Sequence, residues 1–331
     1  MNSFGRIFRV EIYGESHGES VGVVIDGCPP RIKLEPEDFY TDLEKRKPGS
    51  VTGTSKRSES DIPFIKSGVL KGMTTGSPIM IEFINQDKQS DSYDEFVNKP
   101  RPGHADFTAG VKFNGYNDHR GSGHFSARLT VGLVAAGVIA KKIINGVKIN
   151  SRIVEIGGSK DFDLVVKKAS GNGDSLGGII ECTIDDLPVG LGEPFFDSFE
   201  SVISHLVFSI PSVKAVEFGE GFKSAKMKGS EYNDRLTDKT GKTDTNNCGG
   251  ISGGLSNGNQ IVFRAAFRPP SSIMIRQRTL NLKSGRKEDI VITGRHDVCP
   301  VLRSSVIVEA AAAICVADLL LTDKLYKTNN I

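Results

Sequence analysis

The sequence predicts an α/β fold, because segments with strand character alternate with segments of helical character along its 331 residues. Two β-branched runs, at 7–12 and 21–25, flank a polar, glycine-containing turn, which is typical of paired strands. The stretch 126–145 is apolar on nearly every side, so we expect a helix packed inside the protein. A second long helix is expected at about 303–326. A chain of this length can bury a large core.

The remaining elements follow in order between these landmarks. Pro36, acidic residues after it and a Pro48-Gly49 stop predict a short helix that ends in a basic cluster at 45–47. The segment 223–260 is polar and glycine-rich, and its length favours a functional or mobile loop. No repeat or linker marks a boundary, so we expect a single domain over 1–331. Further strands are expected at 148–158, 177–185 and 213–222, and a further helix near 197–208.

The composition excludes several classes of protein. The balance of 42 Lys and Arg against 40 Asp and Glu leaves a net charge of +2, which argues against nucleic-acid or membrane-surface binding. The five cysteines are scattered and form no CxxC pair, which favours a reducing cytoplasm over a disulfide framework or thiolate zinc site. The N-terminus reads as mature protein rather than a secretion signal, and the apolar stretches 129–144 and 306–321 are too short or too interrupted to span a bilayer.

The sequence HRGSGHFSARLT, residues 119–130, concentrates two histidines, two arginines and three hydroxyl side chains without a carboxylate. It resembles a dinucleotide-binding glycine loop only loosely, and the TGKT at 240–243 lacks the first glycine of a P-loop. His119 and His124 stand five residues apart, so they would not share a helical face, and we expect no metal site.

An anion site explains this stretch better. A helix N-terminus offers free N–H groups and a partial positive charge, and Arg128 in a first turn would oppose that charge unless an anion lay between them. Pairing of Arg128 with a carboxylate elsewhere in the chain is the alternative, and the residues alone leave it open. Five of the six histidines stand in polar contexts marked by glycine or proline, whereas His205 looks like an ordinary packed histidine. The residues therefore indicate an enzyme that acts on a multiply anionic small molecule.

Three long segments, 5–30, 101–143 and 294–313, closely resemble the characteristic segments of the chorismate synthase family. Shorter matches at 42–49, 190–197 and 271–281 follow in order, so the resemblance covers nearly the whole chain. It implies conversion of 5-enolpyruvylshikimate 3-phosphate to chorismate and phosphate by a 1,4-anti elimination, the last common step of the shikimate pathway to the aromatic amino acids. That reaction needs reduced FMN without net oxidation or reduction. The resemblance also implies a single-domain β-α-β sandwich, with helices between antiparallel sheets, and a homotetramer.

The resemblance implies catalytic roles for three residues. His17 would protonate the departing phosphate, a role suited to a group that titrates near neutrality. His104 would stabilise the reduced flavin by protonating or hydrogen-bonding its ring. Asp297 would handle the flavin N5 proton.

The implied binding residues form two groups. Arg46 and Arg128 would bind substrate or NADP. Thr52 stands where many members have an arginine, so one substrate or NADP contact is either missing or supplied by Lys56 or Arg57. The resemblance leaves His119 and Arg120 unassigned, and we expect them to hold the loop in shape. The implied flavin contacts are His124, Phe125, Ser126, Pro211, Ser212, Gly253, Arg268, Pro269, Pro270, Ser271, Ser272 and Arg295.

The source of reduced flavin divides the family. This sequence carries no dinucleotide fingerprint and no spare domain, so we expect a separate flavin reductase, with NADPH acting only indirectly. The alternative from another enzyme class is a flavin-dependent reductase that acts on an anionic small molecule. A nucleic-acid-binding protein has little support, because the charge is near neutral and the chain has no tryptophan.

Overall fold

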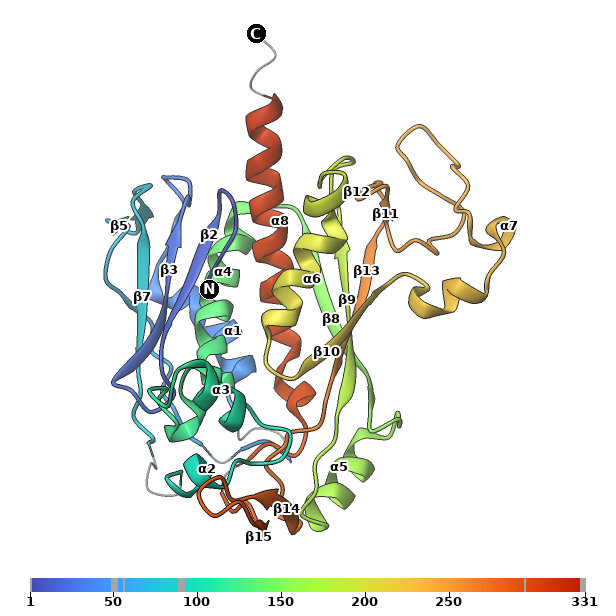
Figure 1. Ribbon diagram of the computed structural model, residues 1–331. Helices are drawn as coiled ribbons and strands as arrows, with labels where there is room; N and C mark the ends of the chain where they lie inside the picture. The colour runs from blue at the N-terminus through green and yellow to red at the C-terminus, as the bar shows by residue number, and fades with distance from the viewer. Residues whose placement is uncertain (1, 49–52, 56, 89–92, 295, 328–331) are drawn as a thin grey trace.

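Two antiparallel sheets enclose a layer of helices in the computed structural model, which describes residues 2–48, 53–55, 57–88, 93–294 and 296–327 (Figure 1). The arrangement confirms the expected β-α-β sandwich. Every strand pairing in the described part of the chain is antiparallel, so the alternation of strands and helices along the sequence does not produce a parallel sheet.

The first sheet contains the predicted hairpin. β2 (Arg9–Gly14) and β3 (Ser20–Asp26) pair antiparallel, with Gly14 opposite Val21. The strand β7 (Ile79–Ile84) was not expected, although its alternating burial follows the pattern of a strand with one face on the core. The strand order is β1-β2-β3-β7-β4, with β1 at Ser3–Phe4 and β4 at Phe64–Ile65.

The second sheet contains three expected strands, β8 (Lys148–Ile156), β9 (Gly178–Asp185) and β10 (Val213–Phe218). A fourth strand that the sequence analysis missed, β13 (Ile261–Phe267), lies between β9 and β10 and buries every second residue. The buried faces of both sheets contribute to one hydrophobic core cluster, which also includes the helices between them.

Two long helices form the middle layer. α4 (Thr130–Ile143) is buried at every position from 130 to 140, and α8 (Ser305–Lys327) runs beside it. The two pack closely at Gly137, where an added Cβ would lie 2.4 Å from the Ala310 Cβ. α8 is apolar and long enough to cross a bilayer by composition, but 72% of its apolar window is buried inside the protein. Its Asp318 carboxylate accepts the backbone N–H groups of residues 6–8 at 2.7–3.0 Å, as expected of a core helix.

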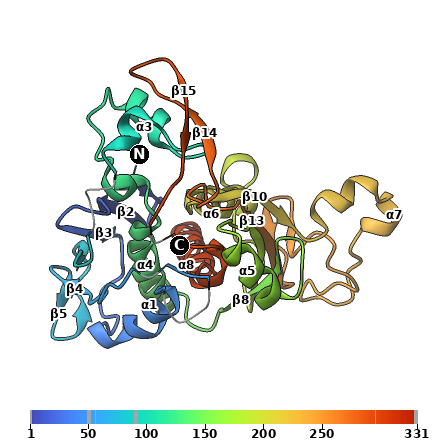
Figure 2. The ribbon, with the colours of Figure 1, turned by 90° about the horizontal axis from the view of Figure 1, so that it is seen from below.

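The smaller elements gather at the ends of the sandwich. Seen from below, the hairpin β14–β15 lies next to α3, with α4 and α8 between the two sheets (Figure 2). The other helices are α1 (Tyr40–Arg46), α2 (Glu95–Asn98), α3 (Asp106–Lys112), α5 (Phe162–Gly171), α6 (Phe199–Ser209) and α7 (Gly229–Tyr232). The other strands are β5 (Val69–Leu70), β6 (Met73–Thr74), β11 (Ile251–Ser252), β12 (Leu255–Ser256), β14 (Gln277–Leu280) and β15 (Lys287–Ile290).

The predicted helix 126–145 starts later than expected. Residues 120–125 and 127–129 form two 3-10 turns, and α4 begins only at Thr130. Ser126 is the N-cap of the second turn, and its hydroxyl oxygen accepts from the Arg128 backbone N–H at 3.3 Å. The segment before it is not helical, since Gly121, Ser122 and Gly123 have φ values of 56°, 69° and 51°. The 3-10 turn at 127–129 runs directly into α4, so Arg128 lies in the first turn of the helix as predicted, although that turn is 3-10 rather than α-helical.

Candidate active site

A cavity of about 310 Å³ lies among the loops and turns next to the starts of α4 and α8. Its walls come from segments far apart in the sequence: the turn after β2, the end of α1, the loop before α3, the two 3-10 turns before α4, and the loops at 268–272 and 293–304. The fold thus brings the predicted catalytic residues His17, His104 and Asp297 to one cavity.

Arginines dominate the lining of this cavity. Six arginines line it, whereas the only lining carboxylates from the described residues are Glu59 and Asp297. Guanidinium groups recognise phosphates and carboxylates through charge-assisted hydrogen bonds, so the cavity is suited to a multiply anionic ligand. The six arginines are Arg46, Arg57, Arg101, Arg128, Arg268 and Arg303.

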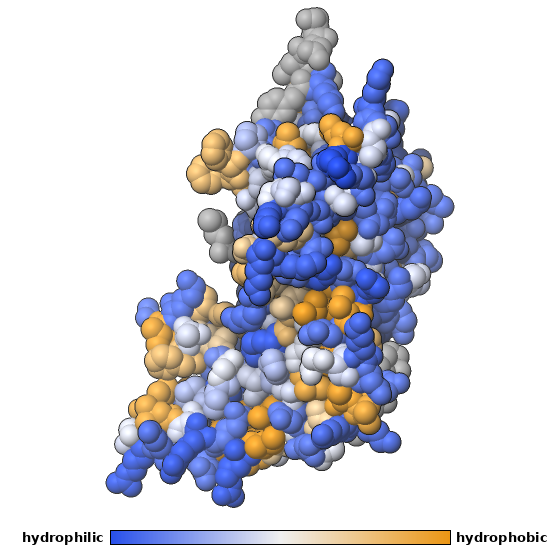
Figure 3. Space-filling model, turned by 90° about the vertical axis from the view of Figure 1, so that its right-hand side faces the viewer, coloured by the Kyte–Doolittle hydropathy of each residue, from blue (hydrophilic) through white to orange (hydrophobic). Residues whose placement is uncertain are grey.

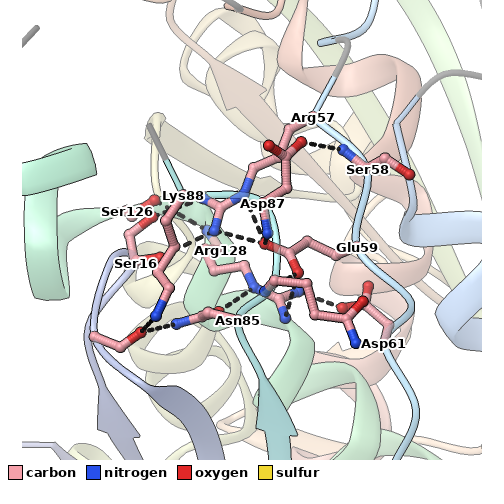
Figure 4. Close-up of polar contacts among 12 residues, drawn as sticks. Ser16, Arg57, Ser58, Glu59, Asp61, Asn85, Asp87, Lys88, Ser126 and Arg128 are labelled. Carbon is pink, nitrogen blue, oxygen red and sulfur yellow. Dashed lines mark hydrogen bonds and ion pairs between the residues drawn. The ribbon is translucent and has the colours of Figure 1, made fainter. Parts of the chain in front are cut away.

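Two of these arginines share a buried carboxylate, Asp61. Arg46 Nη2 lies 2.5 Å from Asp61 Oδ2. Arg128 Nη1 pairs with Asp61 Oδ1 (Figure 4). Burial alone would raise the pKa of Asp61, but the two arginines hold that pKa below its usual value. The structure therefore shows Arg128 paired with a carboxylate 67 residues away in the sequence, the alternative that the sequence left open beside an anion site.

The pairing does not satisfy both guanidinium groups. Arg128 Nε donates to Asn85 Oδ1 at 2.9 Å, but its buried Nη2 has no hydrogen-bond partner among the described residues. Glu59 Oε2 lies 4.0 Å from this atom, beyond hydrogen-bond distance. Arg46 Nε is buried and equally without a hydrogen bond in the described part of the chain. Such donors are costly to bury unless a ligand accepts from them.

Arg57 fixes the turn that carries His17. It donates to Ser16 Oγ at 2.8 Å, to the Ser16 carbonyl at 2.9 Å and to Glu59 Oε1 at 2.8 Å (Figure 4). Glu59 in turn accepts the backbone N–H groups of residues 86 and 87 at 2.9 and 3.3 Å. Arg57 lines the cavity, and its suggested contact with substrate or NADP stays a prediction. Thr52 and Lys56 lie outside the described residues.

His17 is 7% exposed, with its ring edge-on to Tyr93 at 5.3 Å between ring centroids. Burial and the nearby Arg57 lower the pKa of His17 from 6.5 to about 4. The expectation that it titrates near neutrality is therefore wrong for the ligand-free cavity. Gly121 touches the ring so closely that a Cβ built there would lie 2.3 Å from the His17 Cδ2 atom.

His104 and Asp297 are both held by hydrogen bonds. His104 Nδ1 lies 2.6 Å from Asp106 Oδ1, and its Nε2 lies 3.1 Å from Ser122 Oγ. Burial lowers the pKa of His104, against the opposing effect of Asp106. Asp297 accepts from the Ser55 backbone N–H at 2.8 Å and from Arg303 Nη2 at 2.6 Å.

The predicted flavin contacts divide into three groups. Eight of them line the cavity: Phe125, Ser126, Pro211, Ser212, Arg268, Pro270, Ser271 and Ser272. His124, Pro269 and Gly253 do not line it. His124 Nδ1 donates to the Gly14 carbonyl at 2.8 Å, and the residue lines a second cavity of about 260 Å³. Gly253 lies in the exposed turn between β11 and β12. Arg295 lies outside the described residues.

The other histidines behave differently from one another. His119 pairs with Asp94 at 2.8 Å and Arg120 pairs with Asp118 at 2.8 Å, which supports their expected role in holding the loop. His205 is exposed and meets only the edge of the Phe4 ring at 5.4 Å, so the expectation of an ordinary packed histidine is wrong. The segment 223–260 does not line the main cavity and is tied together by Asp234, which accepts from the backbone N–H groups of residues 247 and 248.

Sequence reasoning missed the partners that hold the site together. Asp61 and Ser122 lie 15 and 18 residues from their partners Arg46 and His104, which only the fold brings to them. Asp106 lies in the same short segment as its partners Arg101 and His104, but its role as their acceptor was not predicted. One usable signal was the acidic ESD at 59–61, an interruption in a basic region that could have suggested buried ion pairs.

The chorismate synthase family model matches residues 8–321. The chain belongs to the chorismate synthase family. It is 54% identical over 325 residues to the chorismate synthase of Chitinophaga pinensis, with 98% of each chain covered. The chorismate synthase of Pyrococcus abyssi is 42% identical over 353 aligned residues, again with 98% of each chain covered.

A solved structure has the same architecture. A crystal structure of chorismate synthase superposes with a TM-score of 0.73 and 26% sequence identity, covering 97% of this chain and 93% of that chain. Membership of the family makes the chain a carbon–oxygen lyase of the shikimate pathway, with 5-enolpyruvylshikimate 3-phosphate as substrate and a flavin as cofactor. The alternative of a flavin-dependent reductase is not favoured.

Proposed function

We propose that elimination of phosphate from 5-enolpyruvylshikimate 3-phosphate takes place in the arginine-lined cavity, with reduced FMN as the flavin. The observation that carries this proposal is the pair of buried guanidinium nitrogens without hydrogen bonds in the described structure, Arg128 Nη2 and Arg46 Nε. The substrate bears two carboxylates and a phosphate, so it offers acceptors to several arginines at once. The binding of such a ligand would offset the cost of burying these donors.

Arg46 is better suited to the substrate than to NADP. Its side chain is 3% exposed, and Asp61, which it shares with Arg128, is fully buried. An arginine held in this way acts at the base of a cavity, where a small substrate reaches it. This burial supports the expectation that NADPH acts only indirectly, through a separate flavin reductase.

The residues at one side of the cavity suit the phosphate and ring of FMN. Arg268, Ser271 and Ser272 place a cation and two hydroxyl groups in one loop. The Arg268 backbone N–H donates to the Ser212 carbonyl at 2.8 Å, so the two predicted flavin segments hold each other. When bound, reduced FMN supplies the transient electron that the elimination needs. His124, Pro269, Gly253 and Arg295 stay predictions as flavin contacts.

His17 is proposed to protonate the departing phosphate. Its ring is neutral in the ligand-free cavity at pH 7, because burial and Arg57 lower its pKa to about 4. A phosphate dianion beside the ring favours the imidazolium and raises that pKa. His17 therefore takes up a proton as the substrate binds, and the proton is then available to the leaving group.

Asp297 is proposed to receive the proton of the flavin N5 atom. Its two oxygens accept from the Ser55 backbone and from Arg303, so the carboxylate is oriented at the edge of the cavity. His104 is proposed to support the reduced flavin at another point of the ring. The two residues lie on different segments of the lining, as two separate proton-handling roles require.

The assembly and location are proposed to follow the family: a cytoplasmic homotetramer with one domain per chain over 1–331. Phe195, Phe196 and Phe222 are 87%, 93% and 81% exposed, which supports contact with other copies of the chain. Apolar groups are scattered over the face of the molecule drawn in Figure 3. Sedimentation equilibrium should give four chains per particle, and a monomer would contradict the proposal.

The state of the flavin after turnover tests the function. In an anaerobic reaction, the elimination returns the flavin reduced, so the absorbance of oxidised FMN should not grow as chorismate and phosphate appear in equal amounts. Oxidation of one flavin per substrate consumed would instead show a reductase. When the substrate is supplied with NADPH and oxidised FMN in place of reduced FMN, no chorismate should form. Clear turnover under these conditions would show that the chain reduces its own flavin.

A further inference from the structure

Two residues that the family comparison leaves without a role lie at opposite ends of the His104 ring. Asp106 Oδ1 is 2.6 Å from Nδ1, and Ser122 Oγ is 3.1 Å from Nε2. The Asp106 side chain is 9% exposed and the His104 side chain 16%, so water competes little for either contact. Ser122 and His104 both line the cavity.

Arg101 links Asp106 and Ser122, so that the three residues and His104 form one hydrogen-bond network. Its Nη2 lies 2.8 Å from Asp106 Oδ1, 3.1 Å from His104 Nδ1 and 3.3 Å from Ser122 Oγ. Nδ1 lies closer to the Asp106 carboxylate, at 2.6 Å, than to this donor, so the carboxylate decides which nitrogen carries the hydrogen. The Arg101 guanidinium stacks 4.5 Å from the centroid of the Phe96 ring. A guanidinium can only donate, and the arginine holds the pKa of Asp106 below its usual value, so the carboxylate can only accept.

These constraints select one neutral form of His104. The 2.6 Å contact with a carboxylate requires a hydrogen on Nδ1, which leaves a lone pair on Nε2 in the neutral imidazole. Ser122 accepts from Arg101 and donates its own hydrogen to that lone pair. In this arrangement Arg101 Nη2 donates to Asp106 and Ser122, His104 Nδ1 donates to Asp106, and Ser122 donates to His104 Nε2.

The backbone holds the Ser122 hydroxyl in place. Ser122 has φ of 69° and stands between Gly121 and Gly123, which also have positive φ. L residues with a side chain seldom adopt this conformation, so the position would suit glycine better on backbone grounds alone. The serine side chain is kept there at a conformational cost.

We infer that Ser122 and Asp106 are positioning residues for His104: the carboxylate places the ring hydrogen on Nδ1, and the hydroxyl holds the Nε2 lone pair toward the cavity. The effect of this arrangement on turnover rests on the proposed function, whereas the state of the ring in the free protein does not. Nε2 is then the atom that accepts and returns a proton, because the hydroxyl can donate to the neutral ring and accept from the protonated one.

The charged and titratable groups around His104 are Arg101, Asp106, Arg268 and His296. Arg101 and Arg268 disfavour the imidazolium, and Asp106 favours it. Removal of the Asp106 charge therefore lowers the pKa of His104, and it also releases the ring to exchange between its two neutral forms.

Histidine nitrogen NMR on the ligand-free, full-length protein tests the inference. The His104 signals are those absent from the His104→Asn variant. At neutral pH we expect Nδ1 to be protonated and Nε2 to be unprotonated. In Ser122→Gly and Ser122→Ala, Nε2 should stay unprotonated but shift downfield, because it no longer accepts a hydrogen bond. In Asp106→Asn, the two nitrogens should average, and the pKa of His104 should fall.

Controls separate the hydroxyl from the backbone. Ser122→Gly relieves the left-handed strain and Ser122→Ala keeps it, so an equal effect of both identifies the hydroxyl as the cause. Ser224→Ala removes a hydroxyl that bonds to the Gly221 carbonyl at 2.7 Å outside the cavity, and should leave the His104 signals unchanged. A hydrogen on Nε2 in the wild-type neutral ring, or an unmoved Nε2 signal in both Ser122 variants, would overturn the inference.

Turnover gives the second readout. Ser122→Gly should lower kcat by about tenfold and change KM by less than about threefold, the pattern of a lost positioning contact rather than lost binding. If the NMR result holds and no variant of the chain, wild type included, forms chorismate, the proposed function fails and the positioning of the ring stands. If wild type turns over and Ser122→Gly has unchanged kcat, the positioning role is refuted.

Discussion

Arg46 and Asp61 form an ion pair that is almost completely removed from solvent, with Arg46 Nη2 and Asp61 Oδ2 2.5 Å apart. Because Asp61 also pairs with Arg128, one carboxylate serves two guanidinium groups. This trio leaves a net positive charge in the cavity wall. The charge stabilises an anionic ligand, and the carboxylate keeps the ligand-free protein folded.

Loss of the shared carboxylate should destabilise the protein strongly. In Asp61→Ala two buried arginines lose their partner, and we expect the free energy of unfolding to fall by about 3–5 kcal/mol. Denaturant unfolding measures this change. Asp186→Ala is a matched control, because Asp186 also has positive φ (62°, against 50° for Asp61) but forms an exposed pair with Lys148. A loss no larger in Asp61→Ala than in Asp186→Ala would contradict the assigned role of the trio.

Removal of Arg128 should weaken binding of the substrate. Charge-assisted hydrogen bonds contribute about 1.5–3 kcal/mol each, so Arg128→Ala should raise the dissociation constant by roughly tenfold or more. Titration calorimetry with the substrate and with FMN measures both affinities. Arg235→Ala removes an exposed guanidinium paired with Asp244 and should bind as wild type does. Unchanged affinity for both ligands in Arg128→Ala would mean that this arginine serves only the structure.

An alanine at position 121 should displace the His17 ring. The added Cβ would lie 2.3 Å from the His17 Cδ2 atom, so the ring must move, and we expect turnover to fall by roughly 10- to 100-fold. Gly115→Ala provides the comparison, because Gly115 also has positive φ (78°, against 56° for Gly121) but no atom within 4 Å of the added Cβ. Both variants should lose about 1 kcal/mol of stability from backbone strain. Equal turnover in the two would disprove the ring contact as the cause.

An anion in the cavity should raise the pKa of His17. Sulfate stays a dianion between pH 4 and 7, so it stands in for the phosphate without titrating itself. NMR titration should give a His17 pKa near 4 in the free protein and at least one pH unit higher with saturating sulfate. A pKa that does not respond to bound sulfate would separate His17 from the leaving phosphate.

The same histidine should make the fold sensitive to acid. The unfolded chain protonates His17 near pH 6.5, whereas the folded protein does so only near pH 4. Its contribution to stability is therefore complete above pH 6.5 and is lost as the pH falls from 6.5 to 4, by roughly 2–3 kcal/mol. Relative to wild type, His17→Asn should lose less unfolding free energy over this range. Parallel pH profiles for the two proteins would contradict the low pKa.

Much of the fold followed from local patterns. The hairpin at 7–25 and the helices α4 and α8 were predictable, because β-branched runs around a glycine turn and long apolar stretches have few alternative structures. The loop before α4 was not, because its positive φ values at 121–123 go with contacts to the turn that carries His17, such as the Ser16 N–H donating to the Gly123 carbonyl at 3.1 Å. The strand β7 was missed although Ile79, Ile81 and Phe83 alternate as a strand requires.

The residues with proposed catalytic and binding roles could be predicted from the sequence, whereas the residues that hold them in place could not. His17, His104, Asp297 and Arg128 stand in segments that resemble the family, and the fold brings all four to one cavity. Their partners, such as Asp61 for Arg128, come from other segments and satisfy charges that only the folded chain brings together. The environment of a histidine is likewise invisible in sequence, which is why the low pKa of His17 was not foreseen.

The most direct test of the account is an anaerobic assay of the purified chain with dithionite-reduced FMN and 5-enolpyruvylshikimate 3-phosphate, with chorismate as the readout. Wild type should form one chorismate and one phosphate per substrate consumed. His17→Ala and His104→Ala should remain folded and lose about 10²-fold or more in turnover, the scale of lost acid–base catalysis. Absence of chorismate from wild type, or near-normal turnover in both variants, would contradict the assignment of the arginine-lined cavity as the active site.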